Sequence, residues 1–369
     1  MNRGLSLYLD VVRVFAALVV LVTHLAYVEL SGGMLQPWRL VGNDAVMVFF
    51  VLSGFVIAFV RDEKEKDLAD YAASRLARLW SVALPALLLT LILDGVGRSL
   101  APAAYDSWWY QGDQPMMRLW SAATFTNELW FGSVRPFSNG PYWSLGYEFW
   151  YYAIFAAATY LAGARRTVWV AALCLVAGPK ILLLLPVWWL GVLVYRRTRQ
   201  GPVGPSLGLF LFAGSIIGYI AFRASGLPLV LLDSTRAAVG ADAVAHSLRF
   251  SDEFLSSFVI GPLVAAHFLG AHSLSANLGR RLAPAAGPIQ WFAQFTFAIY
   301  LVHYPLLRFI GALVPYDRHS PLQVALVFAA TLAGCIAVGS VTERFKPLLR
   351  RRLGGWMRSA SPMPVRAPA

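Results

Sequence analysis

The chain has 369 residues, of which 58% are hydrophobic and only 14% are charged, and its formal net charge is +12. Soluble domains carry charge on roughly a quarter of their residues, so this composition excludes an ordinary soluble protein. The positive charge does not indicate nucleic-acid binding either, because Lys and Arg lie between apolar segments and no soluble domain carries a basic face. We therefore expect an all-α, polytopic integral membrane protein.

Apolar segments separated by Gly, Pro and charged residues predict ten transmembrane helices. Their approximate ranges are 6–28, 44–61, 80–97, 142–162, 167–179, 181–195, 207–222, 254–270, 289–310 and 322–342. The fifth and sixth are short and are separated only by Gly178, Pro179 and Lys180. This part of the chain is either two short helices or one bent helix.

The distribution of Lys and Arg predicts the orientation. With a cytoplasmic N-terminus, the cytoplasmic segments carry twenty of these residues and the outer segments only eight. Positive residues accumulate on the cytoplasmic side of membrane proteins, so both termini are predicted to be cytoplasmic. We expect one membrane domain over 1–345 and a basic cytoplasmic tail over 346–369, disordered from Gly354 onward.

The first predicted helix contains Arg13 and His24, two side chains that are costly in hydrocarbon unless they have a partner or a function. They are eleven residues apart, which places them on one helix face with about 16 Å of rise between them. Arg13 suits a phosphate-bearing donor at the cytoplasmic side, with Asp10 available to pair with it, and His24 suits a base at the reacting centre. Alternatively, His24 only hydrogen-bonds a neighbouring helix.

A second constellation opens the fourth predicted helix, between Asn139 and Tyr152. Ser144 and Glu148 share one face, and we expect Glu148 to pair with His24 or Arg13, orienting the imidazole in the first case. Trp143 and the neighbouring aromatic residues are interpreted mainly as an interfacial belt, with ligand contact as the alternative.

Five further residues are candidates for binding. Asp44 lies at the outer end of the second predicted helix, whose Ser53-Gly54 pair predicts close helix packing. Arg75 and Arg78 form a cytoplasmic basic face that suits either a nucleotide phosphate or anionic lipid. In the ninth predicted helix, Tyr300 and His303 form a polar pair, which indicates either a site or an interhelical hydrogen bond.

Common catalytic and metal-binding patterns are absent from the sequence. It contains no GxSxG, HExxH, P-loop or GxGxxG motif, and no His, Cys or carboxylate set has metal-ligand spacing. Cys174 and Cys335 both lie in apolar segments, which excludes a disulfide framework and a CxxC site. We expect no bound metal and no bound cofactor.

Taken together, these motifs resemble the membrane acyltransferase family 3, the O-acyltransferases of bacterial envelope glycans and some antibiotics. The resemblance covers nearly the whole chain in the same order. It is carried by Arg13 with His24, Phe49-Phe-Val-Leu-Ser-Gly-Phe55, Arg75 with Arg78, Trp143-Ser-Leu with Glu148, Tyr300-Leu-Val-His-Tyr-Pro305 and Thr342-Glu-Arg344.

The resemblance implies an acyl-CoA donor on the cytoplasmic side, a sugar hydroxyl as acceptor, and an essential Arg and His that match Arg13 and His24. The basic composition fits a bacterial inner membrane, and we expect a multi-pass protein in contact with lipid and without a nucleic-acid partner. The chain departs from the family at Met47, where many members have an acidic residue, and Asp44 is the candidate substitute. The sequence carries no signal for an oligomeric state.

The resulting hypothesis is an O-acyltransferase that uses acyl-CoA, with acetyl-CoA as the expected donor. His24 acts either as the general base or as a transient acyl carrier. The outer stretch 99–141, rich in Trp and Tyr, forms either an acceptor platform or an interfacial anchor. The alternative functions are a transporter or flippase of a polar glycan or lipid-linked substrate, and a catalytically silent relative.

Overall fold

The computed structural model describes residues 2–65 and 67–359, and all regular elements in these residues are helices. The helices of fifteen or more residues are α1 (Arg3–Leu25), α3 (Gly42–Glu63), α4 (Leu68–Leu100), α7 (Trp143–Tyr160), α8 (Gly163–Ala177), α9 (Pro179–Thr198), α10 (Pro205–Ala224), α13 (Phe254–Ser273), α16 (Thr296–Leu313) and α17 (Pro321–Ser359). The shorter α-helices are α2 (Val28–Ser31), α5 (Pro102–Tyr105), α6 (Pro115–Ala123), α11 (Leu227–Val239), α12 (Ala241–Ala243), α14 (Ser275–Leu282) and α15 (Ala286–Ala293).

Eight helical segments of the described chain are long and apolar enough to cross a membrane. The segments are α1, α3, α4, α9, α10, the stretch Ala241–Ser273 that contains α13, α16 and α17. The predicted fourth and fifth spans correspond to α7, which is rich in Tyr and Trp, and to α8, which has only 15 residues. The prediction of an all-α, polytopic membrane protein is confirmed.

The structure shows whether the middle of the chain forms two short helices or one bent helix. It also differs from the predicted boundaries of two other segments. Residues 163–198 form two helices, α8 and α9, which are separated at Gly178, whose φ of 82° breaks the helical path. The predicted helix 289–310 is wrong at its start, since α15 ends at Ala293 and α16 begins at Thr296.

The other changed boundary concerns the expected C-terminal tail. Residues 346–359 continue α17 without a break, so the disorder expected from Gly354 is wrong for 354–359. Residues 360–369 of that tail lie outside the described residues.

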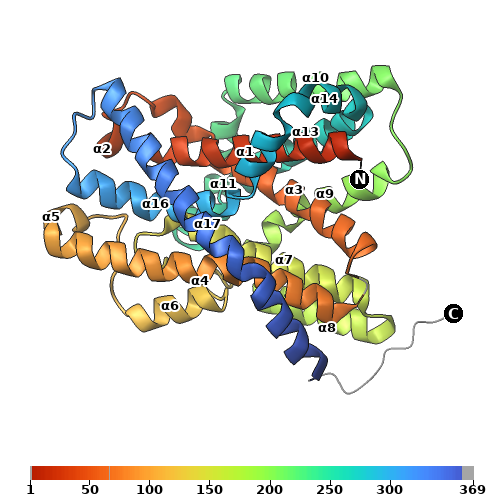
Figure 1. The fold of residues 1–369 in the computed structure, drawn as a ribbon, viewed down its shortest axis with the longest axis horizontal. Coiled ribbons are helices and arrows are strands. Elements are labelled where there is room, and N and C mark those ends of the chain that lie inside the picture. The colour runs from red at the N-terminus through yellow and green to blue at the C-terminus, as the bar shows by residue number, and fades with distance from the viewer. Residues whose placement is uncertain (1, 66, 360–369) are drawn as a thin grey trace.

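The helices run between two faces of the molecule (Figure 1). On one face, here called the inner side, lie the start of α1 and the end of α17, and Arg358 of α17 pairs with Asp70 of α4 at 2.7 Å. The opposite face, the outer side, carries α2, α5 and the end of α16, and Arg308 of α16 pairs with Glu29 of α2 at 2.8 Å. The inner side is the one predicted to be cytoplasmic.

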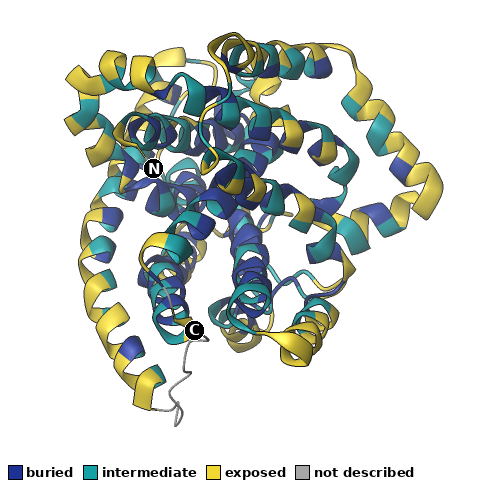
Figure 2. Ribbon diagram, turned by 90° about the vertical axis from the view of Figure 1, so that its right-hand side faces the viewer, coloured by how far each residue is buried: buried dark blue, intermediate teal, exposed yellow. Residues whose placement is uncertain are grey.

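Burial follows the pattern expected in lipid. Buried residues concentrate in the interior, while exposed ones occupy the outward faces of peripheral helices (Figure 2). On α10 these exposed side chains are large and apolar, for example Phe210 at 70% and Ile217 at 65% exposure. In contrast, Tyr142, Trp143, Tyr147, Tyr151 and Tyr152 are buried, so their interpretation as an interfacial belt is wrong.

The close helix packing predicted from Ser53-Gly54 is confirmed between α3 and α9. A Cβ atom on Gly54 would lie 2.1 Å from the carbonyl oxygen of Trp188. Reciprocally, a Cβ atom on Gly191 of α9 would lie 1.9 Å from the carbonyl oxygen of Val51. Neither position accepts a larger residue unless the two helices move apart.

We therefore expect Gly191→Ala to lower the free energy of unfolding by about 1–3 kcal/mol, the usual effect of overpacking a core. Gly95→Ala is the matched control, because nothing lies within 4 Å of a Cβ atom at that helical position. Thermal unfolding in detergent measures both variants. Equal melting temperatures for the two variants would contradict this account of the α3–α9 contact.

Candidate active site

The structure gathers six of the predicted site residues around one cavity on the inner half of the molecule. The six are Arg13, Arg75, Arg78, Ser144, Glu148 and Tyr300, which come from α1, α4, α7 and α16. Apolar side chains of α3, including Phe49 and Val56, complete its wall. We call this cavity the inner pocket.

Three arginines give the inner pocket its positive charge. Arg13 pairs with Asp10 at 3.5 Å, as predicted from their spacing. Arg75 is buried and donates to Oε1 of Glu65 at 2.8 Å, so part of its charge is neutralised. Arg78 has no carboxylate within salt-bridge distance in the described chain, and its guanidinium lies 5.6 Å from the centre of the Phe297 ring. Of the three arginines, Arg78 therefore keeps its positive charge available for an anionic ligand.

Two hydrogen-bonded groups also line the inner pocket. Glu148 accepts hydrogen bonds at Oε1 from Ser53, at 2.6 Å, and from Tyr152. Ser144 donates to the hydroxyl of Tyr300 at 2.7 Å. Neither expected pairing of Glu148, with His24 or with Arg13, is formed in the described chain, because Ser53 of α3 and Tyr152 of its own helix hold the carboxylate.

His24 instead contacts His303, the histidine of the ninth predicted helix. Its Nδ1 lies 3.1 Å from Nε2 of His303 and 2.8 Å from the carbonyl oxygen of Val20. His303 in turn places its Nδ1 2.8 Å from the carbonyl oxygen of Ile299. The two rings, from α1 and α16, have centroids 4.9 Å apart.

The carbonyl groups assign the protons of this pair. A carbonyl oxygen only accepts, so Nδ1 of each ring carries a proton. Neutral His303 then accepts at Nε2 from Nδ1–H of His24, a proton that His24 shares with Val20. Consequently the lone pair of neutral His24 is at Nε2, where no described residue forms a hydrogen bond. This is the tautomer that a general base requires.

Aromatic rings and an ion pair lie next to His24 on the outer side. The Tyr304 ring is 4.8 Å from the His24 ring, centre to centre, and the Tyr27 ring is 6.2 Å away. Arg308 donates to Glu29 at 2.8 Å and to the Tyr304 hydroxyl at 2.7 Å. Burial disfavours ionisation of Glu29, but Arg308 outweighs it and holds the pKa of this carboxyl below its usual value.

Two predicted site residues, Asp44 and Trp143, belong neither to the inner pocket nor to the His24–His303 pair. Asp44 accepts hydrogen bonds from Tyr219, at 2.7 Å, and from Nε of Arg223, at 2.6 Å, which accounts for its burial. Trp143 is buried and stacks on Phe250 with ring centroids 4.7 Å apart. Asp44 therefore has an ion-pair partner and Trp143 has a packing partner, and neither residue lines the inner pocket.

Sequence reasoning missed several residues that shape these sites. Glu65, the partner of Arg75, is hidden in a charge-rich loop, and nothing in its spacing indicates the contact. Arg308 could have been recognised from the sequence, since a charged residue inside a predicted membrane helix indicates a partner or a functional site. So could Lys180, a lone lysine between apolar segments, which is fully buried and pairs with Glu128 at 2.5 Å.

The order of these residues along the chain can be compared with known families. The model of a family described as an acyltransferase domain matches residues 6–340, from the first turn of α1 to about the middle of α17. The chain belongs to the membrane acyltransferase family 3. No curated protein and no solved structure matches the chain. The family membership makes the protein a membrane acyltransferase, and the inner pocket and the His24–His303 pair lie within the matched region.

Proposed function

We propose that the protein transfers an acyl group, expected to be acetyl, from cytoplasmic acyl-CoA to a sugar hydroxyl on the outer side of a bacterial inner membrane. One observation carries this proposal. Helix α1 connects a cationic pocket near Arg13 to a histidine whose unprotonated nitrogen, Nε2 of His24, is oriented by His303. About 16 Å of helix rise separates the two residues.

The inner pocket suits the donor. CoA carries several phosphate groups, and guanidinium groups bind phosphates through charge-assisted hydrogen bonds. Arg13, Arg75 and Arg78 line one pocket rather than scattered surface positions, which favours a phosphate ligand over general lipid anchoring. The long pantetheine arm of CoA then carries the thioester along α1 towards His24.

His24 supplies the proton chemistry. Its Nε2 removes the proton of the acceptor hydroxyl as that oxygen attacks the thioester carbonyl, so a C–O bond forms and the C–S bond breaks. The proton on Nε2 then passes to the CoA thiolate, which leaves as the thiol. During this step the imidazolium is stabilised by its Nδ1–H bond to the Val20 carbonyl oxygen.

His303 takes the orienting role that we expected of Glu148. Its Nε2 accepts a hydrogen bond from Nδ1–H of His24 and thereby keeps the basic lone pair of His24 at Nε2. Glu148, Ser144 and Tyr300 line the inner pocket, where their polar groups are placed to contact the donor.

We expect Arg78→Ala to raise the KM for acyl-CoA about tenfold or more, with a smaller change in kcat, because a charge-assisted hydrogen bond to phosphate is lost. Arg165→Ala is the matched control, since Arg165 is an exposed cation on the same side of the protein. Steady-state kinetics with varied acyl-CoA measures both variants. An unchanged KM in Arg78→Ala would contradict the placement of the donor.

The deciding experiment measures CoA release from acetyl-CoA and longer acyl-CoAs by purified protein in lipid, with a glycan extract as acceptor. The proposal predicts acceptor-dependent release that is lost in His24→Ala. Mass spectrometry of protein incubated with donor alone separates the two roles of His24, because an acyl carrier gains the mass of the acyl group and a general base does not. A transporter would leave every acyl-CoA intact.

A further inference from the structure

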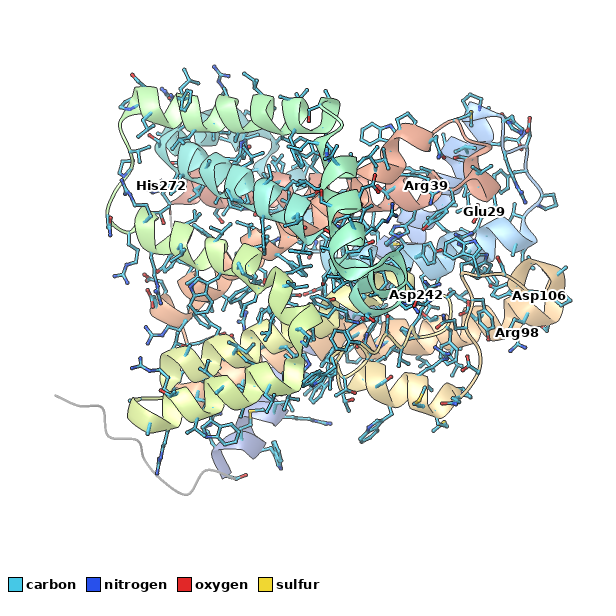
Figure 3. All side chains as sticks on the ribbon, turned by 180° about the vertical axis from the view of Figure 1, so that it is seen from behind. Glu29, Arg39, Arg98, Asp106, Asp242 and His272 are labelled. Atoms are coloured by element: carbon cyan, nitrogen blue, oxygen red, sulfur yellow. The ribbon has the colours of Figure 1, made fainter. Side chains whose placement is uncertain are left out.

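Beside His24, on the outer side, six residues form a group that we call the outer cluster. They are Tyr27, Glu29, Arg39, Trp108, Arg135 and Arg308. The Tyr27 ring joins its parts, because Arg39 lies 4.5 Å and Arg308 4.9 Å from the ring centre. Figure 3 labels Glu29 and Arg39, which lie close together at this end of the molecule.

The outer cluster carries more positive than negative charge. Glu29 neutralises Arg308, whereas Arg39 and Arg135 have no carboxylate within salt-bridge distance in the described chain. Arg308 is only 2% exposed, and its Nε has no hydrogen-bond partner among the described residues. A buried guanidinium with an unused donor, next to two further cations, favours an anionic ligand.

The aromatic residues of the outer cluster indicate that the anionic ligand is a sugar. Trp108 is 59% exposed, and the centre of its ring lies 5.5 Å from that of Tyr27, at a tilt of 44°, and 5.8 Å from the Arg308 guanidinium. The C–H face of a sugar ring is apolar and packs on such a ring, while its polar groups reach charged neighbours. The Tyr27 ring centre also lies 6.2 Å from that of His24, which places the cluster beside the His24 ring.

We infer that the outer cluster is the acceptor subsite and that it selects an anionic sugar, carrying a carboxylate or a phosphate, over a neutral one. This inference rests on the proposed function for the identity of the ligand as acceptor. Arg39 and Arg135 attract the acidic group, Trp108 stacks on the ring, and the sugar hydroxyl is then held near His24.

The test uses three oligosaccharides with one backbone: a carboxylated form, its carboxyl-reduced neutral form and a phosphorylated form. Their equilibrium binding to the full protein in nanodiscs of zwitterionic lipid is measured without any acyl-CoA. Wild type is expected to bind at least one anionic form about tenfold more tightly than the neutral form, and the preferred anion identifies the acidic group. Arg39→Gln and Arg135→Gln are expected to remove this preference.

Arg236→Gln is the matched control, because it removes an exposed arginine on α11 that pairs with Asp233 and not with a residue of the outer cluster. It should leave the preference intact. Equal binding of all three sugars by wild type, or a preference that persists in both Arg39→Gln and Arg135→Gln, would overturn the inference.

A CoA-release assay with the same three sugars separates this inference from the proposed function. Selective binding without CoA release supports an anionic-sugar site and contradicts acyl transfer to that sugar. CoA release at equal efficiency with neutral and anionic sugars supports acyl transfer and overturns the anionic selectivity.

Discussion

His24→Ala is expected to lower acceptor-dependent CoA release by about two to four orders of magnitude, the usual contribution of a positioned general base. The loss should lie in kcat, because His24 is absent from the inner pocket that we assign to the donor. The measurement is steady-state CoA release by protein in lipid at saturating acyl-CoA. Activity close to that of wild type would remove His24 from the reaction.

His303→Ala is the companion to this prediction. It removes the acceptor for Nδ1–H of His24 but leaves Nε2 in place, so we expect a fall of about tenfold or less, corresponding to one hydrogen bond. The KM for acyl-CoA should not change. A loss as large as that of His24→Ala would assign the base to the pair or to His303 itself.

The second large effect concerns the buried ion pair of Lys180 and Glu128. Lys180 is completely buried at the start of α9 and donates to Glu128 and to the carbonyl oxygen of Gly132, both at 2.5 Å. We expect Lys180→Met to lower the free energy of unfolding by about 3–5 kcal/mol, because the Glu128 charge is left buried without its partner. Denaturant titration in detergent micelles measures this change.

The double variant Lys180→Met, Glu128→Leu is the control for this prediction. It removes both charges, and apolar replacement of a buried pair is often neutral or stabilising, so it should be more stable than Lys180→Met alone. If the double variant is as unstable as the single one, the ion pair is not the source of the loss.

The sequence predicted contacts within one helix, where periodicity fixes the geometry. Arg13 pairs with Asp10 on the same helix, as the spacing of three residues implied. Packing at Ser53-Gly54 was also predictable, because a glycine in a membrane helix usually marks close approach of a neighbouring backbone.

Contacts between helices far apart in the chain were not predictable. His24 and His303 are separated by 279 residues, and each looked like an isolated polar residue in its own span. The partner chosen for His24 was therefore Glu148, whose carboxylate is held by Ser53 on another helix. Likewise, the aromatic residues of α7 are equally suited to a membrane interface and to a core, and only the fold shows that they are buried.

The most direct test of the account uses sealed vesicles in which the inner side of the protein faces the medium. Acetyl-CoA is added outside, and an oligosaccharide acceptor is trapped inside. We expect free CoA to appear outside in the same amount as acetylated oligosaccharide appears inside, and neither to appear with His24→Ala. Oligosaccharide that leaves the vesicles unmodified, while acetyl-CoA stays intact, would contradict acyl transfer and identify a transporter.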